Sequence, residues 1–171
     1  MSPKTMASMV LVLLALSGCG GSGPDASAPG AATEACAAGF CVTYPDDWEV
    51  LERSGEFVSL RHPADESIGA TVSEVSMEAL ATANGLVWPQ TPEVVLRSFW
   101  ALIDDGDAQL QTTKPLVDGS VTSFGSYRDG RLWFRLIPIG GLDAIAVEVR
   151  APNSSWSEHA EIITGSVVPV P

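Results

Sequence analysis

The sequence is poor in the residues that most often carry chemistry. Its 171 residues include three cysteines and two histidines, and 9 Lys and Arg residues stand against 21 Asp and Glu residues. The formal net charge of −12 argues against nucleic acid as a partner and against electrostatic adhesion to anionic lipids, because both need a basic surface. No Gly-x-Ser-x-Gly elbow and no phosphate-cradling glycine loop occurs. The sequence therefore predicts no catalytic residues and no cofactor.

A hydrophobic run long enough to cross a membrane is also missing. The apolar segment from Met9 to Leu16 follows Lys4 and falls short of the roughly 20 apolar residues that a spanning helix needs. A basic residue followed by a short apolar segment is typical of an export signal. We therefore predict that residues 1–18 are a signal peptide and that the rest of the chain lies outside the cytoplasm.

The junction between the predicted signal and the rest of the chain reads Leu16-Ser17-Gly18-Cys19, which resembles the lipobox of bacterial lipoproteins. The small residues Ser17 and Gly18 let a peptidase reach the backbone, and the Cys19 thiol is a nucleophile that can accept a diacylglycerol. We predict that Cys19 is the lipidated first residue of the mature chain, which anchors it to the extracytoplasmic face of a membrane, at the cell surface or in the periplasm. The alternative is an ordinary secretory signal with a chance cysteine.

Residues 19–35 are dominated by Gly, Ser, Ala and Pro, a composition that cannot bury a core, and they are predicted to form a flexible tether. Residues 36–171 then make one domain, close to the commonest domain size.

Cys36 and Cys41 remain as an even pair outside the cytoplasm, which predicts a disulfide. Their C-x4-C spacing differs from the C-x-x-C of thiol oxidoreductases, so we expect a structural bond.

Alternating apolar residues and turn signals predict a domain made mostly of strands. The expected strands are 40–44, 48–51, 57–60, 68–75, 109–113, 120–127, 131–139 and 142–150. A helix is expected from Thr91-Pro92-Glu93 to Gly106, and a closing helix from the capping box Ser155-Trp156-Ser157-Glu158. Turns at Asp129-Gly130 and Gly140-Gly141 predict a meander of the last three strands. This pattern indicates an α+β domain in which two helices pack on an antiparallel sheet.

Three stretches, "FCVTYPDDWEV", "ATVSEV" and "APNSSWSEHAEIITGSV", resemble the PsbP/Mog-type domain, including the LpqN-type bacterial lipoproteins. Tyr44, Pro45 and Trp48 match that pattern best. The resemblance implies a PsbP/Mog-like fold and a non-enzymatic binding or assembly role. We expect the domain to bind an envelope protein, or a small apolar ligand between sheet and helix. The rival hypothesis is a metal-dependent or other enzyme on the same scaffold.

The two histidines are weak candidates for a metal site. His62 stands near Asp65 and Glu66, which could suggest metal ligands, but one imidazole and two carboxylates in a Pro-containing stretch are more typical of a solvated turn. His159 lies near the middle of the closing helix and is expected at the surface. We predict no metal site from either residue.

Asp104-Asp105-Gly106-Asp107 places two acids in the last turn of the predicted helix, where they oppose the helix dipole. A bound Ca²⁺ or a basic partner could offset this cost, but the spacing is not that of an EF-hand. A local cation such as Arg97 or Lys114 is the simpler explanation.

Five tryptophans are present, and four of them follow strand or helix patterns that predict burial. Trp88 lies instead in Gly85-Leu86-Val87-Trp88-Pro89, outside any expected element. This loop either folds back on the core or forms an exposed contact surface. We predict the inward arrangement, because an acidic domain tethered near a membrane gains little from a permanently exposed apolar loop.

Overall fold

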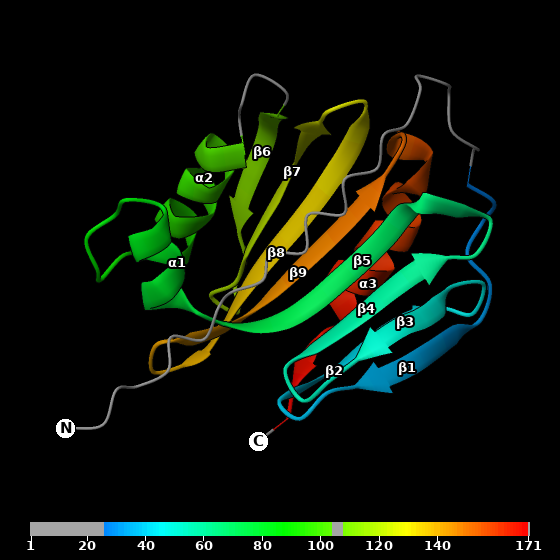
Figure 1. Ribbon diagram of the computed structural model, residues 1–171, viewed down its shortest axis with the longest axis horizontal. Helices are drawn as coiled ribbons and strands as arrows, with labels where there is room; N and C mark the ends of the chain where they lie inside the picture. The colour runs from blue at the N-terminus through cyan, green and yellow to red at the C-terminus, as the bar shows by residue number, and fades with distance from the viewer. Residues whose placement is uncertain (1–25, 104–107, 171) are drawn as a thin grey trace.

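The computed structural model describes residues 26–103 and 108–170. These residues form two antiparallel sheets, of seven strands in the order β3-β4-β5-β9-β8-β7-β6 and of three strands in the order β1-β2-β10, with helices packed on them (Figure 1). The strands are β1 (Ala32–Cys36), β2 (Phe40–Pro45), β3 (Glu49–Arg53), β4 (Phe57–His62), β5 (Asp65–Ser76), β6 (Ala108–Pro115), β7 (Val121–Tyr127), β8 (Gly130–Gly140), β9 (Asp143–Ala151) and β10 (Val168–Pro169). The helices are α1 (Met77–Ala83), α2 (Pro92–Ile103), the short 3-10 helix η1 (Ser154–Trp156) and α3 (Ser157–Ser166). The predicted α+β class is confirmed.

Helix α1 is the element that the sequence prediction missed. It has seven residues, too few to show a helical period, and it begins where Ser76 accepts a hydrogen bond from the Ala79 backbone N–H. The expected count of two packed helices is therefore too low. The prediction placed the strands in one sheet, whereas β1, β2 and β10 form a sheet of their own.

The predicted capping box at the start of the last helix is wrong. Asn153 instead accepts a hydrogen bond from the Ser155 backbone N–H and begins η1. Helix α3 then starts at Ser157 without a side-chain cap. Because the 3-10 turn leads directly into α3, the helix needs no capping box of its own.

The predicted meander is confirmed, since β7 pairs with β8 and β8 pairs with β9. The first turn lies one residue earlier than expected, because Tyr127 pairs with Gly130 and the turn residues are Arg128 and Asp129. Arg128 takes the left-handed conformation there, with φ of 51°. The second turn lies one residue later than expected, because Gly140 ends β8 and pairs with Asp143, and the turn residues are Gly141 and Leu142. Gly140 and Gly141 both have positive φ, which glycine adopts without steric cost.

The predicted tether of residues 19–35 is too long. β1 begins at Ala32 and pairs with β2, so the end of the glycine- and alanine-rich stretch belongs to the folded domain. The small residues of β1 do not show the alternating apolar pattern that predicts a strand. The strand forms because it pairs with β2. The predicted disulfide between Cys36 and Cys41 is present and joins paired positions of β1 and β2.

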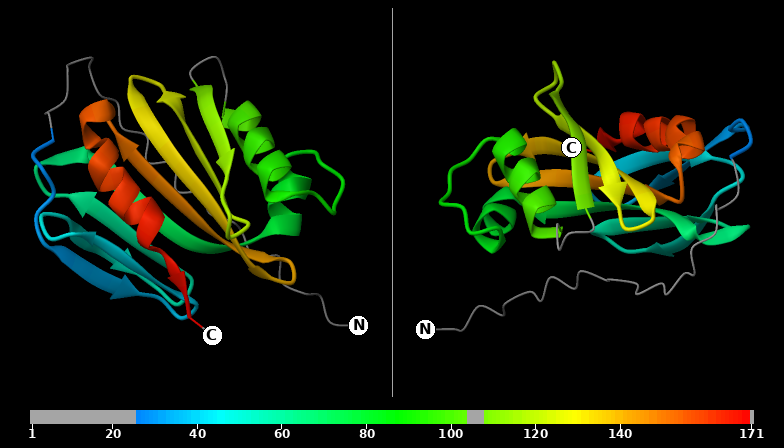
Figure 2. Two further views of the ribbon diagram at one scale, coloured as in Figure 1. Left: turned by 180° about the vertical axis from the view of Figure 1, so that it is seen from behind. Right: turned by 90° about the horizontal axis from the view of Figure 1, so that it is seen from above.

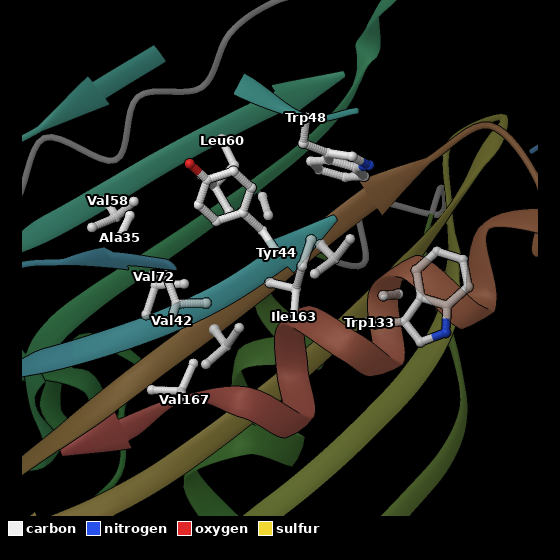
Figure 3. Packing of buried hydrophobic residues seen from close by; sticks show 14 of the residues in the cluster. Ala35, Val42, Tyr44, Trp48, Val58, Leu60, Val72, Trp133, Ile163 and Val167 are labelled. Atoms are coloured by element: carbon white, nitrogen blue, oxygen red, sulfur yellow. The ribbon is translucent and has the colours of Figure 1, made fainter. Parts of the chain in front are cut away.

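Two hydrophobic cores lie on opposite faces of the large sheet. Along β8, Trp133 and Ile137 belong to the core beneath α3, whereas Leu132 and Phe134 belong to the core beneath α1 and α2. The first core also holds the three-stranded sheet against β4 and β5. Figure 3 shows Ile163 and the side chains around it in this core. Figure 2 shows α2 and α3 over different parts of the twisted sheet.

The tryptophan predictions are largely confirmed, because four of the five tryptophans are buried. Leu86 and Trp88 are half-buried against the second core, while Val87 between them is 82% exposed. The loop therefore packs inward through two side chains and exposes the third. No helix in the described ranges is both long and apolar enough to cross a membrane.

We expect Trp88→Ala to lower the free energy of unfolding by about 2 kcal/mol, less than for a fully buried aromatic because Trp88 is only half-buried. Val87→Ala in the same loop is the matched control and should change stability by less than about 0.5 kcal/mol. Urea denaturation of both variants measures the difference. Equal midpoints for Trp88→Ala and the wild type would show that the loop does not contribute to the core.

Candidate functional site

A groove of about 440 Å³ lies between α3 and the neighbouring face of β6, β7 and β8. Strand pairing sets its floor, because Thr112 of β6 is paired with Phe124 of β7, which is paired with Trp133 of β8. These three residues form one row across the sheet. The Phe124 and Trp133 rings lie 5.1 Å apart between centroids, so the middle of the floor is aromatic.

The opposite wall of the groove comes from η1 and α3. Ser157, Glu161 and Thr164 are spaced four and three residues apart, which places them on one face of α3. Ser154 of η1 extends this wall beyond the start of the helix. The remaining lining residues are Thr122, Ser123 and Phe134.

The lining combines an aromatic floor with a hydroxyl-rich rim, and Glu161 is its one charged residue. Such a surface can stack against a flat or apolar part of a ligand and donate or accept hydrogen bonds around it. The described residues that line the groove include no histidine and no cysteine. The arrangement is therefore suited to binding, and its described residues do not form a nucleophile with an adjacent base.

A buried arginine fixes the strand behind the groove. Arg135 follows Trp133 on the same face of β8, and its guanidinium donates hydrogen bonds to Ser120 Oγ (3.0 Å), the Thr164 carbonyl (2.8 Å) and Asp118 Oδ2 (2.7 Å). Hydrogen bonds from the Ser120 hydroxyl and backbone N–H, and the nearby Arg135, lower the pKa of Asp118. The network joins β8, the β6–β7 hairpin and the end of α3, so it sets the width of the groove.

A second cluster of polar and aromatic side chains surrounds Asp47, in the "YPDDW" stretch between β2 and β3. Asp47 Oδ2 lies 3.6 Å from Nε2 of His62 and 3.6 Å from Nε2 of His159. The Trp156 ring lies 4.9 Å from each imidazole ring. His159 is 1% exposed, so the prediction that it lies at the surface is wrong.

The burial of His159 follows from its place on α3. It precedes Ala160 and lies one turn before Ile163, both of which pack into the first core, and its ring stacks on Trp48. Within residues 26–103 and 108–170, neither nitrogen of His159 has a hydrogen-bond partner, and the same holds for Asp47 Oδ1. Sequence reasoning missed this cluster because its members are far apart in the chain and only the fold brings them together.

His62 does not meet Asp65 and Glu66 in the way that a metal site needs. Its Nδ1 accepts a hydrogen bond from Ala64, and Asp65 Oδ1 accepts one from Ser67. His62 is half-buried against Trp156, so the prediction of a solvated turn is only partly right.

Among the described residues, one group of possible metal ligands lies close together, and it comprises Glu34, Cys36 and Cys41. The two cysteine sulfurs of this group are bonded to each other, so they are not free to act as thiolate ligands. Cys19 and the Asp104–Asp107 cluster lie outside the described residues. Arg97, one of the cations proposed to balance that cluster, pairs with Glu93.

No family model matches the sequence, and no curated protein matches it. The structure has a PsbP-like fold. It is similar to the solution structure of cyanobacterial PsbP (CyanoP) from Synechocystis sp. PCC 6803, with a TM-score of 0.57 and 17% identity over 91% of this chain and 99% of that one. A crystal structure from Bacteroides thetaiotaomicron gives a TM-score of 0.43 and 14% identity over 77% of this chain and 45% of that one.

Proposed function

We propose that this chain is a lipid-anchored, extracytoplasmic, non-catalytic binding protein whose ligand occupies the groove between α3 and β6–β8. Three observations support the proposal. The N-terminal sequence has the pattern of an export signal followed by a lipobox ending at Cys19. The fold is PsbP-like. The groove presents an aromatic floor and hydroxyl groups along its wall.

The groove carries this proposal. Its volume of about 440 Å³ lies within the range of roughly 300 to 1,000 Å³ that is usual for small-molecule sites. Its Glu161 carboxylate and the net negative charge of the protein disfavour anionic ligands. We therefore expect a neutral or cationic molecule with an apolar face, and the hydroxyl rim makes a purely apolar ligand a poorer fit than the sequence suggested.

Native mass spectrometry of the full chain, extracted from its own membranes in mild detergent, tests the proposal. We expect a small molecule to remain bound to the wild type. Thr112→Trp should abolish that species, because Thr112 is an exposed floor residue and an indole there fills the groove without disturbing the core.

Glu158→Gln is the matched control. Glu158 is exposed on α3 three residues before Glu161 and does not line the groove, so this variant should keep the bound species. Circular dichroism confirms that all three proteins are folded. A ligand-free wild type, or the same bound species in Thr112→Trp, contradicts the proposal.

A further inference from the structure

The N-terminal segment is fastened to one end of the domain from Ala26 onward. The Ala26 backbone N–H donates to Ser155 Oγ of η1 at 3.0 Å, and the Ala26 side chain packs against the first core. The Ala31 carbonyl accepts a hydrogen bond from the Asp46 backbone N–H at 2.7 Å. Residues 26–31 therefore lie against η1 and the "YPDDW" stretch before β1 begins.

Close packing at Gly30 supports this docking. A Cβ atom added there would lie 2.4 Å from Asp46 Oδ1, so the backbone of the segment passes directly over the Asp46 side chain. The segment from Ala26 to Ala31 is thus held by one hydrogen bond to a side chain, one backbone–backbone hydrogen bond and one apolar contact, and it closely approaches Asp46. These contacts show that the predicted tether contributes only the residues before Ala26 to the spacer.

The spacer between the lipid and the domain is consequently short. Seven Cα-to-Cα steps separate Cys19 from Ala26, and even a fully extended chain covers at most about 25 Å over that length. A domain of this size is roughly 40 Å across. The distance from Ala26 to the lipid is therefore always smaller than the width of the domain.

From this geometry we infer that the domain faces the bilayer with the end that carries η1, the start of α3 and the Pro45–Asp47 turn. This inference rests on the proposed lipid anchor. Figure 1 shows the chain from residue 26 beside the start of α3, with the β8–β9 hairpin at the opposite end of the sheet, and Figure 2 shows the same arrangement. The end that carries η1 and the start of α3 then faces the lipid headgroups, and the β8–β9 hairpin points away from the membrane.

The orientation also places the groove. Ser154 and Ser157 line it on either side of Ser155, the residue that holds Ala26. One end of the groove is therefore next to the docked segment and close to the headgroups. The acidic residues Asp46 and Asp47 lie at the same end of the domain. Because like charges repel, this end faces the bilayer without binding electrostatically to anionic lipid.

Energy transfer from single labelled thiols to acceptor-labelled headgroups tests the orientation. The donor is placed at Ser154→Cys or at Leu142→Cys in the acylated full chain, reconstituted in phosphatidylcholine vesicles. Cys36 and Cys41 are bonded to each other, and Cys19 is blocked by acylation in this sample. We expect at least twofold higher transfer from position 154 than from position 142.

A chain with twenty Gly/Ser residues inserted after Gly23 is the control, and it should lose most of this difference. Ser155→Ala should speed hydrogen exchange at the Ala26 amide several-fold, because it removes the acceptor. Equal transfer from both positions in the unextended, acylated chain overturns the orientation, and unchanged exchange in Ser155→Ala overturns the docking. An unmodified Cys19 in the intact mass overturns the proposed anchor, so the two failures are distinguishable.

Discussion

Gly125→Ala should lower the free energy of unfolding by about 3 kcal/mol, the upper end of the usual cost of overpacking a core. Gly125 lies on β7, where an added Cβ would come within 2.3 Å of the Gln109 carbonyl oxygen and 2.7 Å of the Trp100 ring. The carbonyl belongs to the β6 backbone, and Trp100 is 3% exposed. Its indole N–H also donates to Ser123 Oγ at 2.7 Å, so the ring cannot move away without losing that bond.

Gly165→Ala is the matched control for this prediction. Gly165 lies in α3, and apart from its chain neighbours and the helix's own backbone, no described heavy atom lies within 4 Å of a Cβ built there. Because alanine favours a helix over glycine, this variant should gain roughly 0.5 to 1 kcal/mol. Thermal and urea denaturation of both variants measure the pair of shifts. A Gly125→Ala midpoint within error of the wild type would mean that β6, β7 and α2 leave room for a methyl group at this position.

Arg135→Leu should cost about 3 kcal/mol, because it removes three hydrogen bonds at once and leaves a buried hydroxyl and a carbonyl without their donor. Ser120 is fully buried and Arg135 is 8% exposed, so water does not readily replace the guanidinium. Arg97→Leu is the control, since its pairing with Glu93 is exposed and should contribute less than about 1 kcal/mol. If both variants lose the same small amount in urea denaturation, the Arg135 network does not stabilise the fold.

The same network gives a pH dependence of known sign. The pKa of Asp118 is lower in the folded chain than in an unfolded one, so its stabilising effect is present above the ordinary carboxyl pKa and is lost as the pH falls through the folded value. Half of the Asp118 side chain is exposed, so the effect is small. Asp118→Asn should therefore destabilise the protein at pH 7, and its difference from the wild type in urea denaturation should shrink as the pH falls below the ordinary carboxyl pKa.

The fold was largely predictable because its strands carry their own signals. Alternating apolar residues mark β2, β4 and β5, and glycine turns mark the hairpins of the meander. Helix α1 and β1 were missed, since each is short and depends on contacts with a distant segment. Local patterns cannot report a structure that only tertiary pairing stabilises.

The candidate site was less predictable than the fold. Phe124, Trp133 and Glu161 are ordinary residues in sequence, and they line one groove only because β7, β8 and α3 pack together. The Asp47 cluster shows the same limit, because His62 and His159 approach one carboxylate from β4 and α3. In contrast, Cys36 and Cys41 could be paired from the sequence, since they are close in the chain and the predicted export would place them in an oxidising compartment.

The proposed lipid anchor at Cys19 underlies both the proposed function and the inferred orientation. The mass of the mature N-terminal peptide tests this anchor most directly. The peptide should be recovered from the membrane fraction, begin at Cys19 and carry a thioether-linked diacylglycerol. Cys19→Ser should accumulate as the unprocessed precursor without lipid. A mature chain that begins at another residue, or a Cys19 with no acyl group, would contradict the account.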